Sequence, residues 1–129
     1  MSDLYNHKKG KKGLKRLINA CKYSIDGICS AWKDEEAFRQ VFVLGIIFGI
    51  IGAFLGQTWV EKIFLLLPSV LCIVGELINT AIENAVDFTG TQIHPLAKKA
   101  KDLGSSIQFI LLIFFVIVWG SYIFRFFLS

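Results

Sequence analysis

Apolar residues gather in three long runs along the chain. Residues 41–60 and 107–124 contain no charged side chain, and residues 63–82 contain only Glu76. Each run is long enough to cross the hydrocarbon core of a bilayer as a helix, a distance of about 30 Å. The pattern predicts three transmembrane helices, the first two joined by a short turn at residues 57–62 into an antiparallel hairpin. Pro68 lies inside the second run, where we expect it to bend the helix without ending it.

Residues 14–33 follow a different pattern, in which one apolar face recurs at helical spacing. Polar side chains such as Lys15, Lys22 and Asp26 separate the apolar positions, which are Leu14, Leu17, Ile18, Cys21, Ile25, Ile28 and Trp32. A helix of this kind is suited to lie in the membrane interface. We therefore predict an all-α membrane protein, with an N-terminal amphipathic interfacial helix followed by three transmembrane helices. Residues 14–129 would form one domain after a basic tail of residues 1–13.

Composition supports an integral membrane protein. The chain has 129 residues, of which 54% are hydrophobic, and its mean hydropathy is +0.58. A soluble domain of this size needs a polar shell around a small core. The first long apolar run begins only at Val41, so we expect no cleavable signal. The three cysteines show no CxxC spacing and only two histidines occur, which argues against a metal site built from these residues.

Lysine and arginine residues are concentrated ahead of the first run and in the connection after the second. The predicted hairpin turn has only Lys62, and the C-terminus has only Arg125. Because cytoplasmic loops are enriched in Lys and Arg, we expect the N-terminus and residues 84–106 in the cytoplasm and the C-terminus outside. The expected location is the bacterial inner membrane.

The stretch GELINTAIENAVD, residues 75–87, ends the second apolar run. Glu76, Asn79, Glu83 and Asp87 recur at helical spacing and line one stripe of a single helix. A carboxylate inside a bilayer costs about 2.5–3.5 kcal/mol on insertion scales. Asp87 alone is equally compatible with a solvated helix end, whereas the deeper Glu76 indicates a function.

Two further polar clusters lie next to the other predicted spans. KDEEAFRQ, residues 33–40, places Glu35 before the first span, and AKKAKDLGSS, residues 97–106, places Lys101 and Asp102 before the third. Each cluster alone is an ordinary polar helix terminus. Together the three clusters bring carboxylates, an amide and lysines to one cytoplasmic interface, which predicts a site for an anionic, metal-bearing ligand.

The residue types in these clusters narrow the chemistry. Carboxylates without His or Cys suit Mg²⁺, which binds one or two protein carboxylates together with substrate phosphates. Lysine and arginine suit phosphate oxygens, and a desolvated Glu76 suits a general base that acts on a lipid hydroxyl. The chain has no GxxxxGK[ST] and no soluble protein-kinase signature. A phosphotransferase of a different design is therefore predicted.

Three segments together carry a family resemblance. EEAFRQ at residues 35–40, GELINTAIENAVD at residues 75–87 and HPLAKKAKDLGSS at residues 94–106 resemble the signature segments of the small prokaryotic integral-membrane diacylglycerol kinases. The resemblance covers roughly residues 14–124. It implies a homotrimeric lipid kinase that uses ATP with Mg²⁺ to phosphorylate diacylglycerol, with sites built between subunits and no nucleic-acid partner. The product would be phosphatidic acid, in phospholipid metabolism and recycling.

The resemblance also implies roles for individual residues. Glu76 matches the general base, with Asn79 beside it, and Glu35 and Glu83 match the metal-binding carboxylates. The positions expected near the nucleotide are Arg16, Tyr23, Glu35, Glu83, Asp87, Gln92, Ile93, His94, Lys101 and Asp102. The positions expected near the lipid substrate are Arg16, Ser24, Trp32, Phe38, Arg39, Gln40, Glu76 and Ser105.

Two alternatives to a diacylglycerol kinase stay open. Asn19 and Val41 replace polar or charged residues of several diacylglycerol-specific members, and Pro68 is unusual in the second span. Undecaprenol, the substrate of the related Gram-positive branch, is therefore an alternative acceptor, although AFRQ and AKDLGSS favour diacylglycerol. A non-enzymatic three-span pore or holin-like protein would explain the hydropathy. It would not explain why the Glu76 stripe, Glu35 and Lys101 meet at one membrane face.

Overall fold

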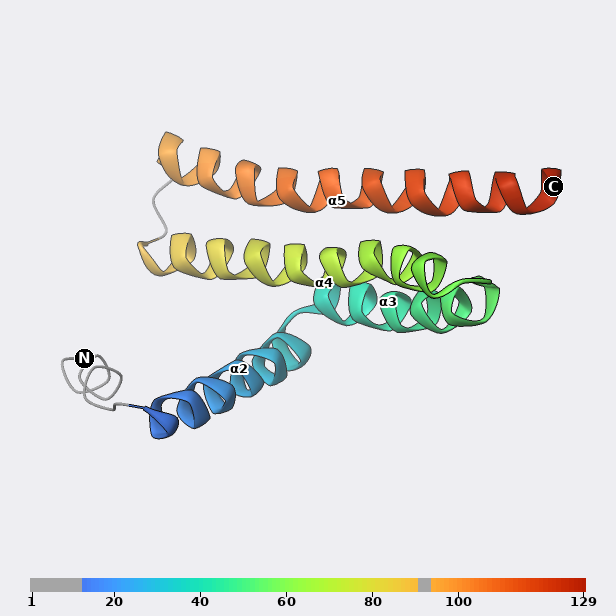
Figure 1. Cartoon of the computed structure of the whole chain (residues 1–129). Helices are drawn as coiled ribbons and strands as arrows, with labels where there is room; N and C mark the ends of the chain where they lie inside the picture. Colours follow the sequence, from blue (N-terminus) through green and yellow to red (C-terminus); the bar gives the residue numbers. More distant parts are fainter. Residues whose placement is uncertain (1–12, 91–93) are drawn as a thin grey trace. The chain divides into compact units, whose positions relative to one another are not determined.

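The structure, a computed structural model, describes residues 13–90 and 94–129. Four helices contain nearly all of these residues: α2 (Leu14–Asp34), α3 (Glu36–Leu55), α4 (Trp59–Phe88) and α5 (Pro95–Leu128) (Figure 1). No strand occurs in the described ranges, and α3, α4 and α5 are each long and apolar enough to cross a membrane. The predicted all-α membrane fold is thus confirmed. The chain divides into two compact units, Met1–Asp34 and Glu35–Ser129, and each is described by itself.

In the described part of the first unit, α2 is an amphipathic helix. Leu14, Leu17, Ile18, Ile25 and Ile28 lie at helical spacing and are all exposed. An apolar stripe that stays open to the surroundings is typical of a helix that lies on a membrane surface. This matches the interfacial helix expected from the sequence.

The turn between α3 and α4 contains only residues 56–58. A Cβ at Gly56 would lie 2.9 Å from the Lys62 backbone nitrogen, so the turn requires glycine there. Thr58 Oγ1 accepts a hydrogen bond from the Glu61 N–H at 3.2 Å and caps the start of α4. Because of this cap, α4 begins already at Trp59. The turn is therefore shorter, and lies earlier in the chain, than residues 57–62.

α4 and α5 are longer than a bilayer is thick. α4 has 30 residues and continues through Pro68, which is fully buried; the expectation that Pro68 does not end the helix is confirmed. At 1.5 Å per residue α4 is about 45 Å long, against a hydrocarbon core of about 30 Å. α5 has 34 residues. One end of each helix can therefore project beyond the lipid tails and present polar side chains to water.

In the second unit, α4 packs against both α3 and α5 and runs antiparallel to each (Figure 1). Leu65, Val118 and Trp119 form a buried core. The ring of Phe48 on α3 meets Phe115 and Trp119 of α5 edge-on, with centroid distances of 4.9 and 5.0 Å. These contacts join all three helices near the α3–α4 turn and hold the three apolar helices in one body.

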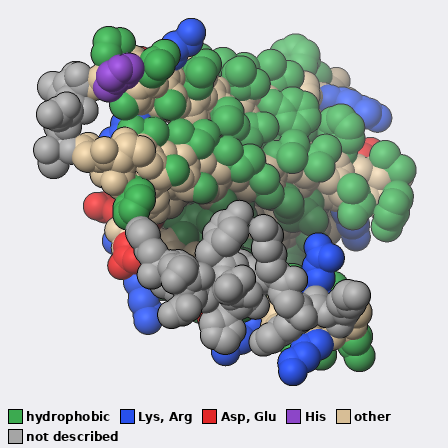
Figure 2. All heavy atoms as spheres, turned by 90° about the vertical axis from the view of Figure 1, so that its left-hand side faces the viewer, with side chains coloured by type: hydrophobic (Ala, Val, Ile, Leu, Met, Phe, Trp, Pro, Cys, Tyr) green, Lys and Arg blue, Asp and Glu red, His purple; other side chains and the backbone are tan. Residues whose placement is uncertain are grey.

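Most apolar side chains outside this core are exposed, and hydrophobic side chains cover much of the described surface in Figure 2. Lipid tails can solvate such a surface, whereas water cannot do so at low cost. Near the turn, Tyr122 donates a hydrogen bond from its hydroxyl to the Leu55 carbonyl at 2.8 Å and ties α5 to the end of α3. The polar residues of interest for function lie at the other end of the second unit.

Candidate active site

Two carboxylates act electrostatically on a third at the end of the second unit opposite the α3–α4 turn. Glu35 is the N-cap residue of α3, and Glu76 and Glu83 lie on α4. Glu76 is only 6% exposed, and the charges of Glu83 and Glu35 both act on it electrostatically. The sequence predicted that Glu76 and Glu83 lie on one stripe and that Glu35 meets this stripe, and in the structure Glu35 acts on Glu76 from the start of α3. The resulting cluster of like charges favours a cation or a proton in its midst.

Asn79 connects this cluster to α5. Its Nδ2 donates a hydrogen bond to Glu83 Oε1 at 3.2 Å. Its Oδ1 is buried and makes no hydrogen bond within the described residues. Gly104 of α5 faces this oxygen, and a Cβ there would approach Asn79 Oδ1 to 2.7 Å. Glycine at position 104 therefore lets α5 come close to the amide that holds Glu83.

Lys101 joins the same cluster from α5. Its Nζ lies 2.6 Å from Asp87 Oδ1 on α4, and Glu83 also acts on it electrostatically. The pair bridges the end of α4 and the beginning of α5. Its side chains are 41% and 63% exposed, so solvent screens it and its contribution to stability is small. Lys101 is nevertheless held beside the carboxylates, where it can meet an incoming anion.

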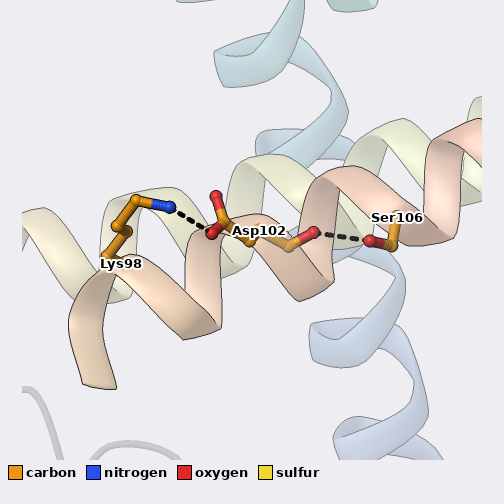
Figure 3. Close-up of polar contacts among 3 residues, drawn as sticks. All are labelled: Lys98, Asp102 and Ser106. Carbon is orange, nitrogen blue, oxygen red and sulfur yellow. Dashed lines mark hydrogen bonds and ion pairs between the residues drawn. The ribbon is translucent and has the colours of Figure 1, made fainter. Parts of the chain in front are cut away.

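Asp102, which follows Lys101 in the chain, points elsewhere. Its Oδ2 pairs with Lys98 Nζ at 2.6 Å, and its backbone carbonyl accepts a hydrogen bond from Ser106 Oγ at 2.8 Å (Figure 3). Both ionic side chains are well exposed along the outside of α5. The two residues that the sequence grouped together thus have different partners. Of this neighbouring pair, only Lys101 reaches α4 among the described contacts.

Other residues of the second unit expected at the site are spread around its polar end. Phe38 is only 1% exposed, and its ring packs near that of Phe42 at 5.7 Å. Gln40 donates to Glu36 Oε1 at 3.2 Å. Arg39 is half-buried one turn after Glu35, and Ser105 is exposed on α5. Their expected contacts with a lipid stay predictions.

His94 has a local structural role at the start of α5. Its Nδ1 accepts a hydrogen bond from the Leu96 N–H at 3.1 Å and caps the helix. This leaves Nε2 for other contacts. Gln92 and Ile93, which were expected beside the nucleotide together with His94, lie outside the described residues.

The remaining expected residues, Arg16, Tyr23, Ser24 and Trp32, lie on α2 and belong to the first unit. All four are exposed there. Ser24 Oγ donates a hydrogen bond back to the Ala20 carbonyl at 2.9 Å, as a helical serine commonly does. Their roles at the nucleotide and at the lipid stay predictions.

The carboxylates of this end of the second unit fit the needs of a Mg²⁺ ion that is bound together with a phosphate. The described ranges contain no group of three or more His, Cys, Asp or Glu side chains arranged to hold a metal ion. A magnesium site at a phosphate needs only one or two protein carboxylates, because water and phosphate oxygens supply the rest. Glu35 and Glu83, both half-buried and both acting on Glu76, meet this smaller requirement. The residues present fit a magnesium ion that arrives with a phosphate ligand.

One buried polar residue was missed from the sequence. Gln108 lies in the apolar run of α5, is 9% exposed, and leaves both Nε2 and Oε1 without a hydrogen bond among the described residues. It packs on Gly75, the residue before Glu76, where a Cβ would approach Gln108 Oε1 to 2.6 Å. In the sequence, the signal that could have identified Gln108 was a single amide side chain within an uncharged apolar run. The significance of Gln108 depends on its contact with Gly75 across the helix interface, and the periodicity of one helix does not reveal a contact with another.

Comparison with known proteins extends over most of the chain. A family model described as prokaryotic diacylglycerol kinase matches residues 22–123. A Helicobacter pylori protein named diacylglycerol kinase is 48% identical over 118 residues, which are 92% of each chain. Proteins of the same name from Pseudomonas aeruginosa and Escherichia coli strain K12 are 37% and 36% identical, covering 88% and 83% of this chain and 92% and 88% of theirs. Because these matches include the helices that bring the carboxylates together, the chain is a membrane-bound kinase and belongs to the prokaryotic diacylglycerol kinase family.

Proposed function

We propose that the protein transfers the γ-phosphoryl group of ATP to the free hydroxyl of diacylglycerol and so forms phosphatidic acid. The bond between the γ-phosphorus and its bridging oxygen breaks, a bond to the lipid oxygen forms, and ADP leaves. The observation that carries this proposal is the buried Glu76 within the electrostatic reach of Glu83 and Glu35. The shared name of the relatives from several bacteria supports the choice of lipid.

In this proposal Glu76 is the general base. α4 is long and apolar enough to span a membrane. We therefore propose that the hydroxyl of a lipid approaches this buried carboxylate, which would accept the hydroxyl proton as the new bond forms. Asn79 lies one turn further along α4 and holds Glu83 by the 3.2 Å hydrogen bond. The low exposure of Glu76 also keeps bulk water, a competing acceptor of the phosphoryl group, away from the reacting atoms.

The nucleotide would lie at the polar end of α4 and α5. Glu35 and Glu83 are the residues that would hold Mg²⁺, which when bound neutralises the phosphate charge that develops during transfer. Lys101, held beside Glu83 by Asp87, would contact phosphate oxygens. The further nucleotide positions proposed are Arg16, Tyr23, Asp87, Gln92, Ile93, His94 and Asp102, and the lipid positions are Arg16, Ser24, Trp32, Phe38, Arg39, Gln40 and Ser105.

The proposed setting is the bacterial inner membrane, with the polar end of the second unit in the cytoplasm where ATP is available. The working form is proposed to be a homotrimer. Light scattering on the purified protein in detergent, corrected for bound detergent, tests the oligomeric state, and a monomer that retains full activity would exclude the trimer.

The decisive experiment compares lipid acceptors side by side. The purified protein in mixed micelles is supplied with γ-labelled ATP, Mg²⁺ and either diacylglycerol, undecaprenol or no lipid. We expect label to appear in phosphatidic acid and turnover to depend on the lipid. Preferential labelling of undecaprenol would assign the protein to the other lipid. The absence of lipid-dependent turnover with either acceptor would contradict the proposed kinase reaction. This is the result expected of a pore-forming protein.

A further inference from the structure

Gln108 is the buried amide that the reaction scheme leaves unused. It lies on a membrane-spanning helix, is 9% exposed, and its Nε2 and Oε1 have no hydrogen-bond partner among the described residues. A polar group in that position is costly unless it gains a partner. Leucine or valine would fill the same space without this cost. The position of Gln108 therefore calls for an explanation in terms of what its amide can reach.

The α4–α5 interface around Gln108 is built from two reciprocal layers. In one layer Asn79 of α4 lies over Gly104 of α5, and in the next Gln108 of α5 lies over Gly75 of α4. In each case a Cβ on the glycine would approach the amide oxygen of the other helix, to 2.7 Å at Gly104 and 2.6 Å at Gly75. Asn79 follows Gly75 by four residues and Gln108 follows Gly104 by four, so the amides occupy adjacent turns of antiparallel helices.

The two amides have complementary vacant groups. Within residues 13–90 and 94–129, Asn79 Oδ1 is a buried acceptor without a partner, and Gln108 Nε2 is a buried donor without one. Adjacent turns are separated by about 5.4 Å along the axis, a gap that a glutamine rotamer change or one bridging water can close. The other end of Asn79 is already engaged, since Nδ2 donates to Glu83 Oε1 at 3.2 Å.

We propose that Gln108 is a positioning residue of the active site, whose Nε2–H donates to Asn79 Oδ1, directly or through one buried water. This contact fixes which end of the Asn79 amide faces Glu83. An amide turned by 180° would present its oxygen to the Glu83 carboxylate and repel it. By excluding that orientation, Gln108 keeps Glu83 in place to bind the nucleotide with its magnesium ion. The inference rests on the role proposed above for Glu83.

The competing explanation is that Gln108 only joins two helices. Amide side chains often stabilise helix pairs in membranes, and such a role would change stability without changing nucleotide affinity. The test therefore uses Gln108→Met, which keeps the shape of the side chain and removes the amide, and Gln108→Leu as a second variant. Ser69→Ala is the matched control. Ser69 Oγ on α4 is also buried and has no hydrogen-bond partner in the described part of the chain, but it lies more than two turns from Asn79.

Two readouts are measured on the purified full-length protein in detergent. Calorimetry gives the affinity for a magnesium complex of β,γ-imido-ATP without lipid substrate, and NMR of ¹⁵N-asparagine-labelled protein follows the Asn79 side-chain amide. We expect both Gln108 variants to bind the nucleotide about tenfold more weakly, the lower end of the effect of losing an outer-shell partner of a metal ligand, because Asn79, the partner of Glu83, is misoriented and not lost. We also expect the Asn79 amide signals to shift. Ser69→Ala should change neither readout.

Unchanged nucleotide affinity in the Gln108 variants would overturn the inference, whether or not the Asn79 signals shift. An equal loss in Ser69→Ala would overturn it as well, because the effect would then be a general response to altered packing. Glu83→Gln separates this failure from that of the proposed function. If Glu83→Gln binds the nucleotide normally, the role of Glu83 is wrong, while the Asn79 signals still report on the contact with Gln108.

Discussion

Glu76 and Lys98 show how differently two charged residues of one membrane protein are placed. Lys98 is paired with Asp102 on the exposed side of α5, where water and salt screen the pair. Glu76 is almost completely buried on α4 and shares its surroundings with two other carboxylates. A solvent-screened ion pair of the first kind contributes little to stability. A buried carboxylate of the second kind lowers the stability of the fold, so its presence indicates a function.

Changes at the three carboxylates should separate chemistry from nucleotide binding. We expect Glu76→Gln to lower turnover by at least about 10²-fold, the usual contribution of a general base, with nucleotide affinity preserved. Glu35→Gln and Glu83→Gln should instead weaken binding of the magnesium–nucleotide complex, since each removes one of few possible metal ligands. Turnover assays and calorimetry on the same preparations provide the check. Equal losses of nucleotide affinity in all three variants would contradict this division of roles.

Lys101 and Lys98 form a matched pair for testing phosphate contact. Both are lysines near the start of α5, but only Lys101 is held at the carboxylates, through Asp87. We expect Lys101→Ala to reduce turnover about 10²- to 10³-fold, the effect of removing a group that stabilises developing charge. Lys98→Ala should stay near the activity of the unchanged protein. Comparable activity of the two variants, measured after membrane insertion has been verified, would make Lys101 an anchoring residue only.

At the scale of helices, the contact between α4 and α5 depends on glycine at specific positions. Gly75 and Gly104 each pack against a side chain of the opposite helix. A Cβ added to Gly120, also on α5, would have no described atom within 4 Å beyond its own neighbours along the helix. Small residues allow close approach of helix backbones in a membrane, where packing rather than the hydrophobic effect drives association. The interface beside Glu76 is thus a closely packed part of α5, in addition to the buried core at Val118 and Trp119, and Gly120 does not contribute its Cβ side to either.

Gly104→Ala is expected to displace Asn79, because the new methyl group would lie 2.7 Å from Oδ1. We expect turnover to fall roughly 10- to 100-fold, since small displacements of positioning groups are costly to catalysis, and the unfolding temperature in detergent to fall too. Gly120→Ala, in open space on the same helix, is the control and should change neither quantity. Similar behaviour of both variants would show that the approach at Gly104 does not matter.

The sequence predicts some of these features and is silent on others for physical reasons. Three spans follow from apolar runs, and the alignment of Glu76 with Glu83 follows from helical periodicity, which is local. The partner of Lys101 is Asp87 rather than its neighbour Asp102, because side chains one residue apart point about 100° away from each other on a helix. The importance of Gln108 depends on its contact with Gly75 of the opposite helix. A contact between two helices leaves no trace in the residue pattern of either helix alone.

At the scale of the whole molecule, the arrangement predicts an orientation. The polar ends of α4 and α5 share one side of the second unit, together with Lys101 and Glu83, and ATP is available only in the cytoplasm. We expect the N-terminus inside and the C-terminus outside the cell. A C-terminal alkaline phosphatase fusion, active only outside, should be active, and the matching green fluorescent protein fusion should be dark. The reverse pattern would contradict the orientation and move the proposed nucleotide site away from ATP.

The three-residue turn between α3 and α4 has a consequence for biogenesis. Three extended residues span only about 10 Å, so we expect α3 and α4 to enter the lipid together as a hairpin. With the N-terminus inside, as we expect, the tip of this hairpin crosses the membrane. The turn at the tip has no charged residue, and the nearby charges of Glu61 and Lys62 are opposite in sign. The free energy gained when two apolar helices are buried in the bilayer exceeds the cost of moving such a tip across it. Insertion of this hairpin should therefore depend on the hydrophobicity of α3 and α4. It should need little help from an energy-consuming translocation machinery.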